Sequence, residues 1–160
     1  MASQVAANNL RGKVYQNFDT AGVLTNHAYD FKGNLLRSER VMIRDFKSTP
    51  DWSVTPPPAL ELDVFTSSTV YDALNRPAQV IPPHLGGATD RCNVIEPRYN
   101  EAGLLERELV WLNEAAEPQG LMTTAPTVEI VTNVDYNAKG QRERINYGNQ
   151  IGRASCRERV

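Results

Sequence analysis

The sequence has few of the side chains that build metal centres and disulfide frameworks. Its 160 residues include two cysteines, Cys92 and Cys156, and two histidines, His27 and His84. A metal site needs several such ligands that converge, and a disulfide framework needs more paired cysteines. Cys92 and His84 could form a nucleophilic pair, but a lone cysteine among strands is usually a packing residue. We therefore expect no enzyme activity and assign no catalytic residue, no metal ligand and no cofactor.

Long apolar runs, basic patches and phosphate-binding motifs are also missing. No apolar stretch is long enough to cross a membrane, and the first residues, Met1–Gln4, do not begin a signal peptide. The formal net charge is −2, which argues against a nucleic-acid partner. There is no glycine-rich phosphate loop and no dinucleotide fingerprint. These absences favour a structural or binding role.

What the sequence has instead is one phrase that occurs five times. Each copy is an aromatic residue, then Asp or Asn, two variable residues, and then Gly or Asn. The copies are Phe18, Asp19 and Gly22; Tyr29, Asp30 and Gly33; Tyr71, Asp72 and Asn75; Tyr99, Asn100 and Gly103; and Tyr136, Asn137 and Gly140. Asp or Asn accepts a backbone N–H bond in a tight turn, and Gly or Asn three residues later tolerates a positive φ. The phrase therefore predicts a strand, a hairpin turn and a second strand.

The acidic positions of the phrase could also be interpreted as the carboxylates of a glycosidase. Asp19, Asp30 and Asp72 occupy them, but Asn100 and Asn137 occupy the same position in sister copies. An amide can make the hydrogen bond of the turn but cannot act as an acid or a base. A turn-forming role is therefore favoured over a catalytic one.

These phrases, with continuations such as Tyr29–Ser38 and Tyr71–Pro77, resemble the YD repeats of the Rhs protein family. The resemblance extends from Leu10 to Gln150, and its longer runs resemble the Rhs-like shell region of insecticidal toxin-complex B and C component proteins. In such proteins, YD-repeat sheets form a hollow β-shell that encapsulates a toxic C-terminal polypeptide for delivery. The resemblance implies an all-β fold, an antiparallel meander of YD-repeat hairpins that is one segment of a larger β-shell.

The resemblance also implies partners and a location. The partners would be the remaining YD repeats of a longer chain, the encapsulated C-terminal toxin domain and other toxin-complex subunits. The full-length protein would be secreted or displayed at the cell surface. The family's self-cleaving aspartate motif has no match in this sequence, so the resemblance transfers no catalytic residue. The main alternative is a cell-surface segment for adhesion that binds carbohydrate through exposed tyrosines.

The two ends of the chain differ from the repeats. Residues 1–9 are small and polar, and we expect a frayed or truncated N-terminus there. Residues 151–160 back-translate to a common short-read sequencing adapter, so we interpret them as a translated artefact and expect disorder. The predicted YD-repeat segment is therefore 10–150, and it contains Cys92 but not Cys156.

Alternation of apolar and polar residues predicts strands between the turns. It is clearest at 128–136 and also marks 60–64, whereas 35–46 carries charge on both faces. Such charge suits a sheet that is wetted on both sides better than a sandwich. Residues 101–116 are rich in Ala, Leu and Glu, which favours a helix. The turn phrase that ends at Gly103 requires a strand instead, and we favour the strand.

Proline and glycine interrupt the strand pattern at two places. The stretches 47–58 and 82–87 are therefore predicted to be loops. Trp52 is the residue expected to pin the first of them to the sheet. Cys92 follows the second and is expected to lie in a loop-like stretch.

The tyrosines of the phrase, Tyr29, Tyr71, Tyr99 and Tyr136, allow two interpretations. An exposed row of rings could stack on sugars. We instead expect the tyrosines to stack on one another between adjacent strands, which stabilises a sheet by about 0.5–1.5 kcal/mol per pair.

Overall fold

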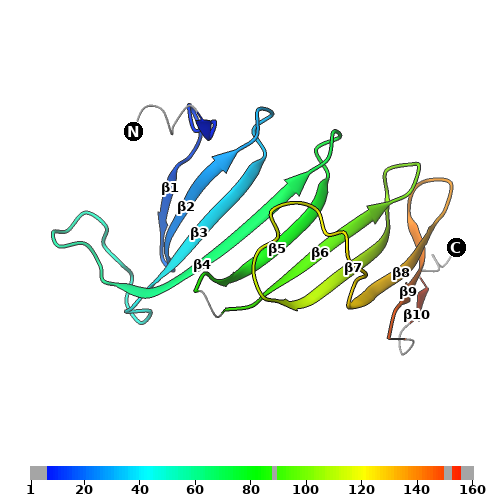
Figure 1. Cartoon of the computed structure of the whole chain (residues 1–160). Coiled ribbons are helices and arrows are strands. Elements are labelled where there is room, and N and C mark those ends of the chain that lie inside the picture. The colour runs from blue at the N-terminus through cyan, green and yellow to red at the C-terminus, as the bar shows by residue number, and fades with distance from the viewer. Residues whose placement is uncertain (1–6, 88–89, 150–152, 156–160) are drawn as a thin grey trace, which may run out of the picture. The chain divides into compact units, whose positions relative to one another are not determined.

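The computed structural model of the chain describes residues 7–87, 90–149 and 153–155. The strands within them are β1 (Gln16–Asp19), β2 (Gly22–Tyr29), β3 (Leu35–Ile43), β4 (Leu60–Tyr71), β5 (Pro77–Leu85), β6 (Cys92–Tyr99), β7 (Leu105–Glu114), β8 (Val128–Tyr136), β9 (Arg142–Tyr147) and β10 (Arg153–Ser155). They form one sheet in which the strands follow one another in chain order, and neighbouring strands such as β1 and β2, β2 and β3, and β6 and β7 pair antiparallel (Figure 1). The predicted all-β antiparallel meander is confirmed. Within the described ranges, no helix is long and apolar enough to cross a membrane.

From β2 onward, successive strands are joined alternately by tight turns and by longer connections. Short turns join β2 to β3, β4 to β5, β6 to β7 and β8 to β9, whereas residues 44–59 and 115–127 form long loops after β3 and β7. Strand β7 settles the ambiguity at 101–116, because it begins at Leu105, directly after the turn that ends at Gly103. The local turn therefore outweighs the helix propensity of the residues that follow it.

The chain divides into two compact units, and each is described by itself. The first comprises the residues up to Val70 together with Pro82–Arg91. In this unit Val23 pairs with Val41, and Val41 pairs with Val64. Their side chains therefore form one apolar row on one face of the sheet.

Loop 44–59 of the first unit folds back onto the end of that row. The Trp52 ring lies 5.2 Å from the Phe18 ring, centroid to centroid, and Phe18 pairs with Val23. The Trp52 indole Nε1 donates a hydrogen bond to the Asp19 carbonyl oxygen at 3.1 Å. The prediction that Trp52 pins this loop to the sheet is confirmed.

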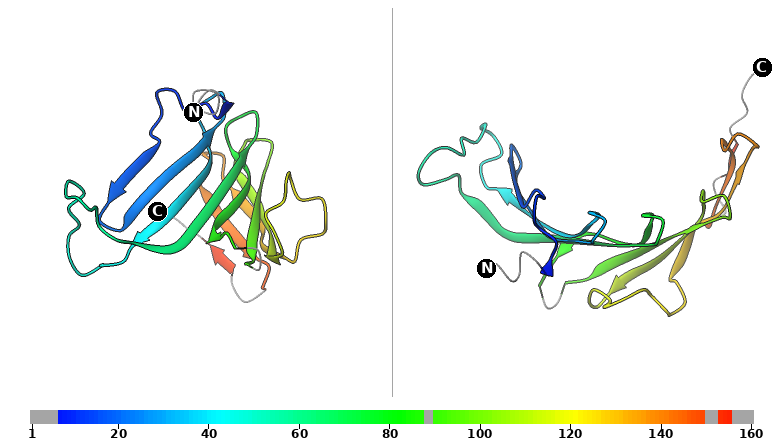
Figure 2. Two further views of the ribbon diagram at one scale, coloured as in Figure 1. Left: turned by 60° about the vertical axis from the view of Figure 1, so that its left-hand side comes forward. Right: turned by 90° about the horizontal axis from the view of Figure 1, so that it is seen from above.

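The second unit comprises Tyr71–Ile81 and the residues from Cys92 onward. It contains a cluster of buried side chains from three strands, with two partly buried residues packed against it: Ile81, Cys92, Val94 and Trp111, with Leu109 and Met122. Met122 belongs to loop 115–127, which crosses the face of β5–β7 (Figures 1 and 2). The core of this unit therefore lies between one face of the sheet and its own loop.

Two loop predictions are wrong. Pro82, Pro83 and His84 lie inside β5, and Cys92 is the first residue of β6 with 3% of its surface exposed. Proline lacks an N–H donor, but its fixed φ suits an extended backbone, so two prolines do not by themselves end a strand. Strand β5 thus extends to Leu85, and β6 begins at Cys92.

The ends of the chain are partly structured. The Tyr29 N–H donates to the Asn8 carbonyl oxygen at 3.0 Å, and the Asn9 amide donates to the Tyr29 carbonyl oxygen at 2.9 Å. The rest of the N-terminal expectation, residues 1–6, lies outside the described residues. Disorder at 151–160 is wrong for Arg153–Ser155, which pairs with β9, and the other residues of that tail lie outside the described part.

Candidate functional site

Four of the five phrases form turns of the same geometry. In each, the Asp or Asn carbonyl oxygen accepts the N–H of the residue three positions later, at 2.8–3.1 Å. The Asp or Asn N–H then donates to the carbonyl oxygen of the residue four positions later, at 2.9–3.0 Å. The hydrogen-bonded positions are Asp30, Gly33 and Asn34; Asp72, Asn75 and Arg76; Asn100, Gly103 and Leu104; and Asn137, Gly140 and Gln141.

The side chain of the Asp or Asn completes each of these turns. Its Oδ1 accepts the N–H of the residue four positions later, at 2.8 Å for Asp30 and 3.0 Å for Asn100. Because Asn100 and Asn137 make this bond as Asp30 and Asp72 do, acidity is not needed. The catalytic interpretation of the carboxylates therefore has no support in these turns.

The two carboxylates of this set stay ionised because of the same bonds. Desolvation raises the pKa of Asp30, but the hydrogen bonds from Asn34, Gly33 and Lys32 together lower it by more. The net effect is a pKa below the usual value of an aspartate. The backbone N–H of Arg76 is the main cause that lowers the pKa of Asp72. A depressed carboxyl pKa is the opposite of what a general acid requires at neutral pH.

The last residue of each of the four turns has a left-handed backbone. The φ angle is +95° at Gly33, +63° at Asn75 and +76° at both Gly103 and Gly140. Asn75 therefore replaces glycine, as the phrase predicts, because asparagine is one of the least penalised residues in this region.

Substituting valine for Gly33 or Gly103 is expected to lower the free energy of unfolding by about 1–2 kcal/mol or more, because a β-branched residue resists a positive φ. Gly120→Ala is the matched control, since no atom lies within 4 Å of the position of its added Cβ and its φ is not left-handed. Urea denaturation measures the difference. Equal stability of Gly103→Val and Gly120→Ala would remove the turn assignment.

The fifth phrase, at Phe18, is built differently. The turn of this phrase joins β1 to β2, and the next phrase follows after one strand, β2. The two turns therefore lie at opposite ends of β2. Asp19 pairs with Gly22, and the Asp19 Oδ1 accepts the N–H groups of Ala21 and Gly22 at 2.8 and 3.0 Å. Arg40 on β3 donates to the same oxygen at 2.6 Å, and this bond is the main cause that lowers the pKa of Asp19.

Three of the tyrosines of the phrase donate their hydroxyls to main-chain carbonyl oxygens. The hydroxyl of Tyr29 donates to the Val14 carbonyl oxygen at 2.8 Å, that of Tyr99 to Pro77 at 3.0 Å, and that of Tyr136 to Leu105 at 2.6 Å. In the described part of the chain, the one ring pair is Phe18 with Trp52. The expected stacking of tyrosines is therefore wrong. Each of these three tyrosines ends its strand, where its hydroxyl reaches the backbone of an earlier segment.

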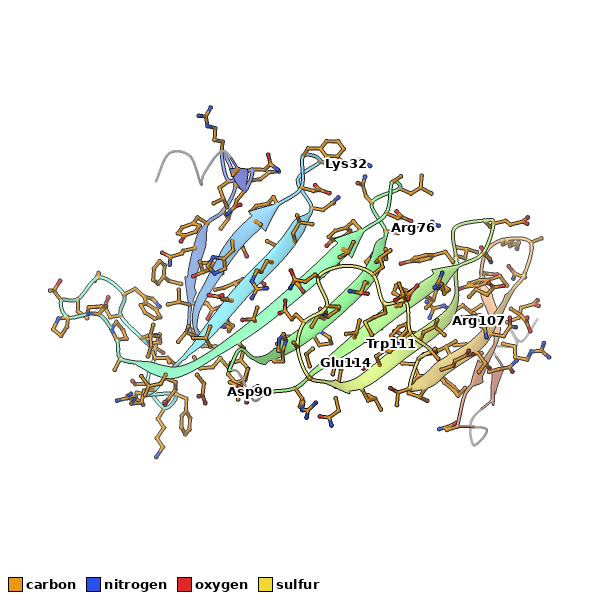
Figure 3. All side chains as sticks on the ribbon, in the orientation of Figure 1. Lys32, Arg76, Asp90, Arg107, Trp111 and Glu114 are labelled. Atoms are coloured by element: carbon orange, nitrogen blue, oxygen red, sulfur yellow. The ribbon has the colours of Figure 1, made fainter. Side chains whose placement is uncertain are left out.

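Neighbouring turns of the second unit also touch through side chains. Figure 3 labels Arg76, at the turn before β5. Its guanidinium lies 4.3 Å from the centre of the Tyr99 ring and 2.7 Å from the Asp72 carboxylate. One residue thus joins its own turn to the next through an ion pair and a cation–π contact. A side chain added at Gly103 would meet Arg76, and one added at Gly140 would meet Leu104.

The residues first considered for catalysis are Cys92 and His84. Cys92 is buried, and desolvation, followed by the carboxylates of Glu117 and Glu114, raises the pKa of its thiol. A protonated, buried thiol is a poor nucleophile. The His84 Nδ1 lies 3.0 Å from the Pro82 carbonyl oxygen. Within the ranges that the structure describes, no group of three His, Cys, Asp or Glu side chains could hold a metal ion.

Comparison with known proteins gives matches to solved structures alone. No protein-family model and no curated protein matches the chain. The crystal structure of TcdB2-TccC3-Cdc42 matches over 92% of this chain with a TM-score of 0.67 at 21% identity. The Tc holotoxin pore of Photorhabdus luminescens, with a TccC3 point mutation, matches over 91% with a TM-score of 0.67 at 23% identity. The chain spans 6% of the length of each of these chains, and it has the fold of a segment of these toxin-complex structures, as its resemblance to the Rhs-like shell region implied.

Proposed function

We propose that the chain is a structural YD-repeat segment of an Rhs-like toxin-complex protein, part of the wall of a β-shell that encapsulates a toxic C-terminal polypeptide for delivery. The observation that supports this most is the fold that it shares with toxin-complex structures along nearly its whole length. Its partners are then the remaining YD repeats, the enclosed toxin domain and other toxin-complex subunits. The full-length protein is secreted or displayed at the cell surface, and this segment is not an enzyme.

The chemistry of the turns suits a wall. The turn carboxylates and amides are engaged by backbone N–H groups, and three tyrosine hydroxyls are engaged by backbone carbonyl oxygens. Polar groups that are satisfied within the sheet stabilise one geometry and leave little for chemistry on a substrate. A passive role as a barrier is consistent with this arrangement.

The carbohydrate-binding alternative has less support. Tyr29 is 9% exposed, and Tyr99 and Tyr136 are half-buried with their hydroxyls donated to main chain. A sugar-stacking platform needs exposed ring faces, and the face of Tyr99 is partly taken by Arg76. Binding to a glycan array that disappears in Tyr99→Ala and Tyr136→Ala, with folding retained, would reinstate this alternative.

Protease protection tests the shell proposal in the full-length protein that carries this segment. We expect the C-terminal polypeptide to resist digestion in the parent and to become sensitive when Gly22→Val and Gly103→Val disrupt the wall. Gly120→Ala serves as the control, with protection retained. Digestion of that polypeptide at the same rate in the parent, in both valine variants and in Gly120→Ala would overturn the proposal.

A further inference from the structure

Residues 115–127 of the second unit, which we name the strap, lie across the sheet face that contains the buried cluster. Figure 3 shows Trp111 on β7 and Glu114 at the end of this strand, where the strap begins. The Trp111 indole Nε1 donates to the Thr124 hydroxyl oxygen at 3.1 Å. The strap is therefore attached to the sheet near its far end as well as through its connections to β7 and β8.

A buried glutamine of β5 holds the middle of the strap. Gln79 is 2% exposed, and its Nε2 donates to the Gly120 carbonyl oxygen at 3.1 Å. The Met122 N–H donates to the Gln79 Oε1 at 2.9 Å. The amide thus makes with the strap the pair of bonds that a neighbouring strand would make. Opening of the strap would break both of these bonds, so the Gln79 amide stabilises the closed strap.

No residue of the strap is buried, and most of them are exposed. Met122 packs against the buried cluster, whereas Leu121 is 52% exposed and Thr123 and Ala125 are exposed. Segments with few buried apolar contacts open at a lower free energy than the strands that they cover.

We propose that the strap opens as a unit while the strands of the second unit stay folded, and that Gln79 is the latch that holds it closed. Cys92 is the natural reporter of this motion, because its thiol belongs to the cluster against which Met122 packs and is 3% exposed when the strap is closed. A thiol reagent reaches Cys92 only after opening.

Labelling of Cys92 with an aromatic disulfide, in a Cys156→Ser background, tests the motion. If the strap opens locally, the labelling rate is nearly constant at low urea concentration and rises with the unfolding slope only near the transition. A rate that follows the global unfolding slope from zero urea onward would overturn the proposal, since the thiol would then be exposed by unfolding alone.

Variants test the latch. Gln79→Ala removes two hydrogen bonds to the strap and is expected to speed labelling by about tenfold or more. Thr124→Ala, which substitutes no residue of the sheet, is expected to speed labelling by about fivefold through loss of the bond from Trp111. Thr123→Ala is the matched control and should label at the parent rate. Parent-like rates in both Gln79→Ala and Thr124→Ala, or equal acceleration in Thr123→Ala, would contradict the latch.

Discussion

Replacing Gly22 with valine is expected to lower the free energy of unfolding of the first unit by about 3 kcal/mol or more. Gly22 has a φ of +141°, and a Cβ at this position would overlap the carbonyl oxygen of Val41 on the neighbouring strand. The overlap is with backbone, so a rotamer change cannot relieve it. The close approach of β3 to β2 would have to be given up.

A matched glycine separates this overlap from backbone strain. Gly12 also has a positive φ, +69°, but no atom lies within 4 Å of its added Cβ. Gly12→Val is therefore expected to cost about 1–2 kcal/mol, from φ strain alone. The fluorescence of Trp52 in a Trp111→Phe background measures the unfolding of the first unit, because this unit contains Trp52 and not Trp111. If Gly22→Val and Gly12→Val lowered the free energy of unfolding equally, the approach of Val41 to Gly22 would not be tight.

Trp111→Ala is expected to destabilise the second unit by about 3–5 kcal/mol. Trp111 is 3% exposed, packs in the buried cluster with Val94, and holds Thr124 of the strap. Leu112, the next residue of β7, is 46% exposed and gives the control. Leu112→Ala should cost less than about 1 kcal/mol in the same urea titration, followed by circular dichroism. A comparable decrease in the free energy of unfolding for Trp111→Ala and Leu112→Ala would contradict a core that lies on one face of the sheet only.

The turns were predictable because their physics is local. Asp or Asn and a residue that tolerates positive φ lie within four positions, and the hydrogen bonds that they make are within the same short segment. Even the exception at Phe18 has a sequence signal. Only one strand fits between Phe18 and Tyr29, so consecutive phrases there fall at opposite ends of the strands.

The roles of the tyrosines and of Gln79 were not predictable from pattern. Tyr136 donates to Leu105, 31 positions earlier, and Gln79 contacts Gly120, 41 positions later. A single glutamine inside a strand carries no periodicity, and only the folded sheet brings it to the strap. The loop predicted at 82–87 was wrong for another reason. Proline is frequent in loops, but its fixed φ is compatible with an extended strand such as β5.

Nuclear Overhauser contacts across the turns test the central claim most directly. The structure pairs Tyr29 with Leu35, Tyr99 with Leu105, and Tyr136 with Arg142, each pair on the two strands that flank one turn. We predict cross-strand backbone contacts at all three pairs, with positive φ at Gly33, Gly103 and Gly140. Helical contacts between residues three apart through 101–116, with no contact between Tyr99 and Leu105, would contradict the account.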